Sequence, residues 1–443
     1  MLSALSRVLE KLNIFFLSIM IATTLGAESF AHFAIAMSYA LICFSIVEVG
    51  GQQLYTFFNA NFERISPDKL NLLKVFLFAL LLPSLFFIDS WQLVSLIALG
   101  YLFESLNNSY RFKMFEFGHH SIEARVYLGE RLITLSAILT VYVLNYFSVG
   151  VVIDLIPMFT FVFLVKVSFF IVNRFLSNKI ADSATTSVLS KYLNYVIEGK
   201  YFIFSAFVAA LFMQIDILIF SWLDAGDEDV ALISALLRLV TATFFIATVF
   251  QQFILPKFQM LLADNKYFFQ YERYVSYFAF FLTFALIALC DVYLSIFFGV
   301  NMQKDLEGFN VSLLLLLVFT RFTRDPVSLY LGQTGKNKVK VKVITMLLPI
   351  KVLAIYFGYT HYGFYAAICV IVVFDSLIYL LFRYVTQFKV FVPSYWLGAA
   401  LLITFIYIIE YLPLSVRIAI ALICLLSALI IFPKVTKLGV SFK

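Results

Sequence analysis

The sequence predicts an all-α polytopic membrane protein with two six-helix lobes and two further helices at its C-terminal end. Three observations predict this class: 63% of the 443 residues are hydrophobic, only 13% are charged, and the mean hydropathy is +0.98. Soluble domains carry about 25% charged residues and have too little interior to bury so much apolar surface. The apolar runs are long and unbroken, whereas the strands of an outer-membrane barrel alternate at every second residue. Lipid is therefore the expected solvent for most of the chain.

The number of spans follows from the apolar runs, because a transmembrane helix needs about 20 mostly apolar residues. Fourteen segments qualify: 8–25, 31–54, 70–88, 91–112, 128–147, 149–172, 201–222, 230–255, 275–298, 309–331, 339–359, 363–385, 395–411 and 414–432. The last two are short and flank Pro413. They form either two full spans or one re-entrant pair, which would leave twelve full spans.

Basic residues gather on one side of this arrangement. With the N-terminus in the cytoplasm, 25 of the 32 Lys and Arg residues fall in cytoplasmic segments, and only Lys304 and Arg417 fall in external ones. The external connections are short and acidic, as between Asp224 and Asp229. Cytoplasmic loops of membrane proteins are enriched in Lys and Arg, so we expect both termini in the cytoplasm.

The chain also repeats itself weakly. When it is shifted by 200 residues, segment 19–58 meets segment 219–258 and nine of 40 positions match, among them Gly26 with Gly226 and Glu28 with Glu228. Six spans per half is an even number, so both halves should run in the same direction, an arrangement found in some transporters. The expected divisions are an N-lobe at 1–175, a cytoplasmic linker with an interfacial helix at 176–200, a C-lobe at 201–388, and spans 13 and 14 at 389–443.

Several classes of function are disfavoured by what the sequence contains. The cysteines at 43, 290, 369 and 424 each lie within an apolar run, so we expect buried thiols and no disulfides. No CxxC pair or Cys/His cluster is present, and neither a metal site nor a cofactor is predicted. The net charge of +6 fits basic cytoplasmic loops better than nucleic-acid binding. No P-loop motif is present, so the chain is not expected to hydrolyse ATP itself. Any transport by this chain would then take its energy from an ion gradient or from consumption of the product.

Charged residues inside the spans are the candidates for function, since each costs about 2.5–3.5 kcal/mol on insertion scales. The densest group comprises Arg321, Arg324 and Asp325 in the tenth span, Lys351 in the eleventh and Asp375 in the twelfth. One interpretation is a cationic cavity for an anionic substrate, since the arginine fork suits phosphate. The alternative is a set of ion pairs between helices, or along one helix between Arg321 and Asp325.

Other intramembrane charges allow two interpretations each. Asp216 and Arg238 either pair with each other or act as a coupling carboxylate and a substrate-binding cation. Glu48 is either an ion-coupling group or a solvated carboxylate at a helix end. Lys166 lies too deep for easy snorkelling and is either a substrate-binding cation or a structural charge. Glu104 begins a polar face that lines water or packs against other polar groups.

Several segments resemble those of polysaccharide transporters. They are the first external turn LGAESFAHFA at 25–34, VEVGG at 47–51, QIDILI at 214–219, LPK at 255–257 and LGQTGK at 331–336. Their order and spacing along nearly the whole chain make it similar to Wzx-type O-antigen flippases. These form the polysaccharide transporter branch of the multidrug/oligosaccharidyl-lipid/polysaccharide exporter superfamily.

The resemblance implies two lobes in a V around a central cavity and a multi-pass protein of the bacterial inner membrane. It implies translocation, by ion-coupled alternating access, of an undecaprenyl-pyrophosphate-linked glycan such as an O-antigen repeat unit. In this role Arg321, Arg324, Lys351, Arg238 and Lys166 would bind substrate, while Asp216, Asp375 and Glu48 would couple ions. The implied partners are membrane lipid, a polysaccharide polymerase and a chain-length regulator.

Two alternatives remain open at this stage. A polytopic O-antigen polymerase or ligase has similar hydropathy, but such enzymes place catalytic residues on a long external loop, and every external connection here is short. The chain is therefore not expected to be an enzyme. A multidrug antiporter of the same superfamily carries a coupling acid in the first span. Here no Asp or Glu follows Glu10 in that span, which argues against the antiporter.

Overall fold

The computed structural model describes most of the chain as α-helix. The described residues are 2–48, 66–88, 90–146, 155–179, 189–223, 225–244, 246–247, 250, 254, 265–298, 312–334, 336–386, 393–409 and 411–438. Within these ranges the regular elements are α-helices and one short 3₁₀ turn, and no strand occurs. The motif at 255–257 and the end of the motif at 47–51 lie outside the described residues. The predicted all-α class is confirmed.

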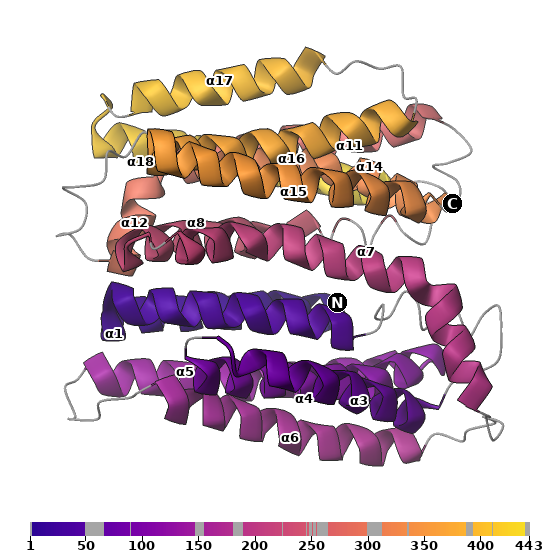
Figure 1. The fold of residues 1–443 in the computed structure, drawn as a ribbon. Helices are drawn as coiled ribbons and strands as arrows, with labels where there is room; N and C mark the ends of the chain where they lie inside the picture. Colours follow the sequence, from indigo (N-terminus) through magenta and orange to yellow (C-terminus); the bar gives the residue numbers. More distant parts are fainter. Residues whose placement is uncertain are drawn as a thin grey trace. The chain divides into compact units, whose positions relative to one another are not determined.

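Contacts between helices divide the chain into two compact units, Met1–Ala231 and Leu232–Lys443. Unit 1 contains α1 (Leu2–Val47), α3 (Pro67–Leu85), α4 (Trp91–Glu116), α5 (His120–Tyr146), α6 (Leu155–Asn178) and α7 (Leu189–Trp222) (Figure 1). Helix α1 contacts α3, α4, α5 and α7, and α4 contacts α6. Helices α1 and α4 therefore hold the other helices of this unit together.

Helix α1 covers both of the first two predicted spans. It is continuous from Leu2 to Val47 except at Gly26, whose φ of 85° and ψ of 177° are not helical. A backbone of this kind is open to glycine and strained for other residues. Gly26 thus separates two helical segments that are each long enough to cross a membrane, at the place where the sequence predicts the first external turn.

Helix α7 joins two elements that the sequence predicts separately. The interfacial helix expected within 176–200 and the seventh span at 201–222 form one helix of 34 residues, Leu189–Trp222. Figure 1 shows this helix bent, with its N-terminal part turned away from the rest. Because α7 packs on α1, the span that the sequence places first in the C-lobe lies in unit 1.

Helix α8 (Asp227–Thr243) begins in unit 1 and continues into unit 2. Unit 2 also contains α11 (Asn265–Ala288), α12 (Cys290–Phe298), the 3₁₀ turn Leu313–Leu315, α14 (Leu316–Gln333), α15 (Asn337–Tyr362), α16 (Phe364–Thr386), α17 (Pro393–Ile409) and α18 (Leu414–Leu438). Helix α11 contacts α14, α17 and α18, and α16 contacts α14 and α15. The last two helices are therefore integral parts of unit 2.

The ninth predicted span is broken. The sequence predicts one helix over 275–298, but α11 and α12 meet at Leu289 with a bend of 59°. The two C-terminal elements are separate helices, of 17 residues in α17 and 25 residues in α18. At about 1.5 Å per residue, α18 is long enough for a full span and α17 is slightly short for one.

Three pairs of packed helices in unit 1 have counterparts in unit 2. Helix α3 packs on α4 as α11 packs on α14, α4 packs on α6 as α14 packs on α16, and α5 packs on α6 as α15 packs on α16. The chain order of these pairs is the same in each unit. These contacts agree with the parallel repeat that the sequence predicts.

The surface is apolar where lipid is expected. Seven helices of the described chain are each long and apolar enough to cross a membrane, and the bent pair α11 and α12 adds an eighth. Helix α14 does not qualify by itself because three charges interrupt it, and α8 and α17 are short. Large exposed apolar side chains such as Phe175, Leu353 and Ile430 stand on α6, α15 and α18. Soluble proteins rarely expose so much apolar surface, and the chain is a multi-pass membrane protein.

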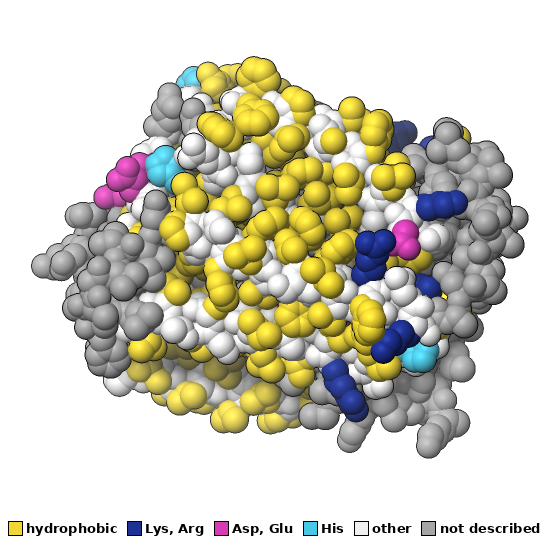
Figure 2. Space-filling model, turned by 90° about the horizontal axis from the view of Figure 1, so that it is seen from below, with side chains coloured by type: hydrophobic (Ala, Val, Ile, Leu, Met, Phe, Trp, Pro, Cys, Tyr) yellow, Lys and Arg dark blue, Asp and Glu magenta, His cyan; other side chains and the backbone are white. Residues whose placement is uncertain are grey.

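Figure 2 shows one face on which apolar side chains cover the middle and most of the visible Lys and Arg side chains lie toward one end. This is the distribution that the charge asymmetry of the sequence predicts for that face.

One cysteine departs from expectation: Cys43, Cys290 and Cys424 are buried, but Cys369 is exposed on α16. An apolar run indicates a membrane span, and a residue in a span can face lipid as readily as protein.

Candidate functional site

Helix α14 presents two arginines from one face. Arg321 and Arg324 are three positions apart, and residues with this spacing lie on the same side of a helix. The hydroxyl of Thr323 donates to the carbonyl of Phe319 in the preceding turn, over 2.8 Å, and so needs no partner from another helix. At a rise of about 1.5 Å per residue, Arg321 lies about 18 Å from the C-terminal end of α14.

Both arginines bind the same carboxylate. Nη2 of Arg321 donates to Oδ2 of Asp375 on α16 over 3.2 Å, and Nη1 of Arg324 donates to Oδ1 over 2.7 Å. Asp375 is fully buried, and the side chain of Arg321 is only 2% exposed. Arg324 is the one with accessible surface, at 16% of its side chain. The carboxylate therefore holds two cations in place inside unit 2.

Two lysines and a second aspartate extend this cluster. Lys351, fully buried on α15, acts electrostatically on Asp375. Asp325 lies close enough to Arg324 and Lys340 to interact with both. We call these six residues, Arg321, Arg324, Asp325, Lys340, Lys351 and Asp375, the α14–α16 cluster. Its four cations and two carboxylates give it a formal excess of two positive charges.

The α14–α16 cluster has polar atoms without partners among the described residues. Nε of Arg321 has no hydrogen-bond acceptor, although the side chain is buried. The hydroxyl of Tyr271, a buried residue of α11 that lies near Asp325, also has none. Buried polar groups without partners are costly, and each calls for an explanation. An excess of positive charge and a free donor are features that an anion would satisfy.

The structure pairs these residues differently from one sequence-based alternative. Arg321, which could have paired with Asp325 along α14, donates instead to Asp375 on another helix. The group itself is as predicted: Arg321, Arg324, Lys351 and Asp375, from three consecutive helices, lie together. Whether they bind substrate stays a prediction.

A second buried ionic cluster lies in unit 1. Glu104 of α4 forms ion pairs with Arg131 of α5 and Lys166 of α6. Glu130 lies 3.7 Å from Arg131 and 3.8 Å from Lys166. Lys166, predicted to bind substrate, is therefore held by two carboxylates of its own unit. The sequence indicates that Glu104 begins a polar face of its helix, but it does not indicate which residues of other helices pair with Glu104.

This second cluster extends to the first helix. The hydroxyl of Tyr127 donates to Glu10, and the guanidinium groups of Arg111 and Arg131 lie 3.5 Å and 4.5 Å from the centre of its ring. Glu10 also acts electrostatically on Glu104. An acid of the first predicted span thus joins the network, which weakens the sequence argument against a drug antiporter.

The two clusters occupy equivalent helices. Unit 1 uses α4, α5 and α6 for Glu104, Arg131 and Lys166, and unit 2 uses α14, α15 and α16 for the arginines, Lys351 and Asp375. The signs are exchanged between the first and third helices of each set. A carboxylate on α4 binds a lysine on α6, whereas arginines on α14 bind a carboxylate on α16. Because an ionic cluster recurs on equivalent helices, each cluster is expected to hold its three helices together. The cluster in unit 2 differs in having an excess of cations.

Glu48, a predicted ion-coupling residue, lies near the end of α1. It accepts a hydrogen bond from Ser105, one over 3.1 Å from Asn108 and one over 3.3 Å from Lys74, and it forms an ion pair with this lysine. Lys74 is completely buried and also donates to the carbonyl of Ser105. Glu48 is therefore a well-bound carboxylate rather than a freely solvated one.

Asp216 and Arg238, the remaining predicted site residues, are both buried. Asp216 lies on α7 in unit 1 with no exposed surface, and Arg238 lies on the part of α8 that belongs to unit 2. Their predicted pairing and the coupling role of Asp216 stay predictions. An additional buried pair, which the sequence analysis missed, joins Glu272 of α11 to Arg383 of α16 over 2.9 Å. Arg383 lies near the end of the twelfth predicted span, where a basic residue is expected to face the cytoplasm.

Comparisons with known proteins identify the fold. No family model and no curated protein sequence matches the chain. Among solved structures, the chain is similar to the lipid II flippase MurJ in an inward closed conformation, with 13% identity, a TM-score of 0.65, and 97% of each chain covered. It is also similar to an inward-facing multidrug resistance MATE family transporter of the MOP superfamily, with 13% identity and a TM-score of 0.61. That comparison covers 91% of this chain and 99% of the transporter. These likenesses extend over nearly the whole chain, which therefore has the fold of these polytopic transporters.

Proposed function

We propose that the chain is a flippase that moves a lipid-linked, anionic oligosaccharide across the membrane by alternating access. The substrate we infer is an undecaprenyl-pyrophosphate-linked glycan, such as an O-antigen repeat unit, and the membrane is the bacterial inner membrane. The observation that carries the proposal is the formal excess of two positive charges in the α14–α16 cluster. The fold supports it, since one similar structure is described as a lipid II flippase.

The physical argument starts from the substrate. A diphosphate cannot cross hydrocarbon by itself, because transferring its charges without partners is prohibitive. A protein route must supply positive charge at mid-depth. We infer that Arg321 and Lys351 supply it, because both lie within predicted spans. Arginine adds two parallel donors that match a phosphate group. The glycan would remain in an aqueous path while the polyprenyl chain stays in lipid.

Asp375 has a defined part in this proposal. In the structure its carboxylate occupies donors of both arginines. A diphosphate carries more charge than one carboxylate and can displace it from Arg324, whose side chain is the most accessible of these three. Arg321 and Lys351 are buried, so they would reach the substrate only when unit 2 opens. Asp375 would then hold the cations when no substrate is bound.

A drug antiporter is the second candidate, because the fold is also that of a multidrug transporter. The charge of the α14–α16 cluster separates the two. An excess of cations favours an anionic substrate, whereas a cationic drug is better bound by carboxylates. Ion coupling by Asp216, Glu48 or Asp375 fits either transporter. If Asp216→Asn leaves export and its dependence on sodium or pH unchanged at normal abundance, Asp216 is not the coupling group.

The test is complementation of a flippase-null strain, scored by surface glycan at equal protein abundance. Arg321→Ala and Lys351→Ala should abolish export, since a charge-assisted contact contributes about 1.5–3 kcal/mol, or roughly ten- to a hundredfold in affinity. Arg321→Lys should restore part of it, because charge returns without the fork. Arg417→Ala is the matched control, since Arg417 pairs with the half-exposed Asp291 elsewhere in unit 2.

The double variant Arg321→Ala with Asp375→Asn separates binding from structure. If Arg321 only neutralises Asp375, the double variant should export at least as much glycan as Asp375→Asn alone, because Arg321 would then have no further task. If Arg321 binds the diphosphate, the double variant should export less than Asp375→Asn at equal abundance. Export of drugs by the wild-type chain, without any complementation of glycan export, would support the antiporter instead.

A further inference from the structure

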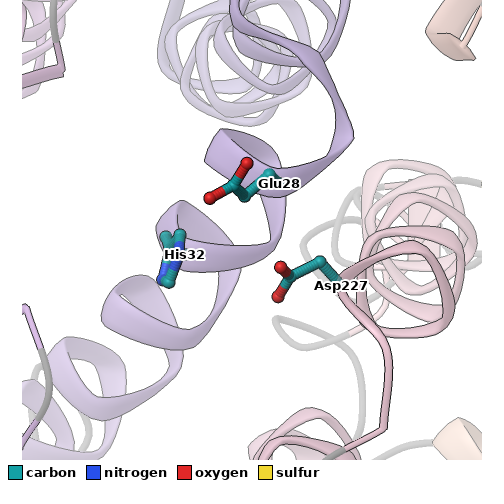
Figure 3. A group of neighbouring side chains, drawn as sticks. All are labelled: Glu28, His32 and Asp227. Atoms are coloured by element: carbon teal, nitrogen blue, oxygen red, sulfur yellow. The ribbon is translucent and has the colours of Figure 1, made fainter.

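Three side chains with metal-binding atoms converge where α1 meets the start of α8. They are Glu28 and His32 on α1 and Asp227 in the first turn of α8, and one donor atom of each lies within 4.8 Å of the others. Figure 3 shows the carboxylate of Asp227 directed toward the face of α1 that carries the other two. All three are exposed, so an ion can reach them from solution.

The local structure brings the donors together from separate elements. Glu28 and His32 are four residues apart in a helix, which places both on one face. The non-helical Gly26 ends the preceding segment and sets where this face begins. Asp227 comes from a helix that begins almost 200 positions later, after the turn that the repeat makes equivalent to the turn at Gly26. All three residues belong to unit 1.

No other described group uses these donors. Neither a hydrogen bond nor an ion pair joins Glu28, His32 or Asp227 to another described residue. The first turn of α8 adds two more acids, Glu228 and Asp229. Acids in a first helical turn are stabilised by the helix dipole, and this accounts for Asp227 without a ligand. It does not account for an imidazole and a carboxylate from α1 facing the same point.

The donor set selects the class of ion. One imidazole nitrogen and two carboxylate oxygens suit first-row transition metals and above all Zn²⁺, whereas Ca²⁺ and Mg²⁺ prefer oxygen ligands alone. Zinc at about 2.1 Å from each donor would hold the donors about 3.4 Å apart in tetrahedral geometry. The donor atoms lie within 4.8 Å of one another, so zinc binding would require the three exposed side chains to rotate closer together. A fourth position would remain for water.

We propose that Glu28, His32 and Asp227 form a zinc-binding site that fastens the start of α8 to α1. Helix α8 is the element through which the chain passes from unit 1 to unit 2. A metal bridge at its first turn would restrain the movement of α8. The zinc site shares no residue with the α14–α16 cluster. The topology expected from the basic residues puts the site on the external side.

The experiment measures zinc binding to the purified full-length chain in detergent after chelator treatment. Equilibrium dialysis should give one tightly bound Zn²⁺ per chain, and zinc should raise the melting temperature. Co²⁺ should bind at the same place and give visible absorption bands. His32→Ala, Glu28→Gln and Asp227→Asn should each weaken zinc binding by at least about tenfold.

Matched controls make the result specific. Glu228→Gln removes the same charge beside Asp227, and His361→Ala removes another exposed imidazole on α15, so both should bind zinc as the wild type does. Excess Ca²⁺ should not displace zinc. The proposal fails if wild type binds no zinc, if His32→Ala binds as well as wild type, or if Glu228→Gln loses as much affinity as Asp227→Asn. No transport substrate is involved, so this result is independent of the proposed flippase activity.

Discussion

Arg321 and Asp375 stand 54 positions apart in the chain, yet Nη2 of Arg321 lies 3.2 Å from Oδ2 of Asp375 inside unit 2. Both side chains are almost completely buried. A buried pair of this kind offers little net stability over apolar residues, but breaking it leaves an uncompensated charge. Removing Asp375 would leave more than one uncompensated positive charge, because Arg324 binds the same carboxylate and Lys351 acts on it.

Loss of Asp375 should therefore destabilise the protein more than loss of an arginine. Asp375→Asn removes the carboxylate that binds two arginines, and the expected loss is about 3–5 kcal/mol. Arg321→Gln should cost less, since Arg324 still neutralises Asp375. Adding Arg321→Gln to Asp375→Asn should recover part of the loss. The measurement is thermal unfolding of the purified variants in detergent.

The pair of Asp291 and Arg417 is the control for this prediction. The side chain of Asp291 is 43% exposed, and exposed pairs contribute about 0–1 kcal/mol. Asp291→Asn should therefore change the melting temperature little. An Asp375→Asn variant as stable as Asp291→Asn would show that the α14–α16 cluster does not need its carboxylate.

The unit 1 cluster should respond to an exchange of charges. Glu104→Gln leaves Arg131 and Lys166 without their shared partner, with Glu130 at 3.7 Å and 3.8 Å as the remaining acid, so stability and abundance should fall. Glu104→Lys should be worse, and adding Lys166→Glu should restore part of the abundance, because the pair of positions 104 and 166 is re-formed with its signs exchanged while the new lysine still lies beside Arg131. An exchange variant no more abundant than Glu104→Lys would refute this direct pairing.

The kink of α1 provides a test of backbone conformation alone. A Cβ at Gly26 would meet nothing within 4 Å, so the cost of Gly26→Ala comes from its positive φ of 85°. A residue other than glycine in such a region costs about 1–3 kcal/mol. Gly226→Ala is the control, because a Cβ there also meets nothing and its φ is not positive. We expect the melting temperature to fall for Gly26→Ala only.

Membrane topology is tested by single cysteines on a cysteine-free background. Ser66→Cys and Asn337→Cys should react with an impermeant reagent only after the cytoplasmic side is exposed, because they lie at the N-terminal ends of α3 and α15, next to predicted cytoplasmic loops. Gly226→Cys should react from outside in intact cells. Labelling of Ser66→Cys from outside would reverse the predicted orientation.

Much of the fold follows from patterns that are local in the sequence. Apolar runs of about 20 residues define the helices, since each span must satisfy its own backbone hydrogen bonds in lipid. The positions of most helices and the parallel repeat were therefore predictable. The break at Leu289 and the fusion of two elements in α7 were not, because hydropathy measures the affinity of a segment for lipid and says nothing about its direction.

The membership of the α14–α16 cluster was predictable for a similar reason. A charge within a span is costly, so residues such as Arg321, Lys351 and Asp375 on consecutive helices were expected to meet. Their pairing was not predictable. The spacing of Arg321 and Asp325 allows a bond along one helix, but helix packing places Asp375 within reach instead. Glu104 shows the same limit, since its partners come from two other helices.

By itself, the sequence determined that this chain lies in a membrane, that it is helical, and which charged residues lie within the apolar spans. These properties depend on composition and on the length of each segment. The tertiary structure alone decided that Asp375 holds two arginines, that Glu104 holds Arg131 and Lys166, and that His32 faces Asp227. Such contacts depend on how each helix is rotated about its axis and on which helices pack together, and no local pattern of residues encodes either.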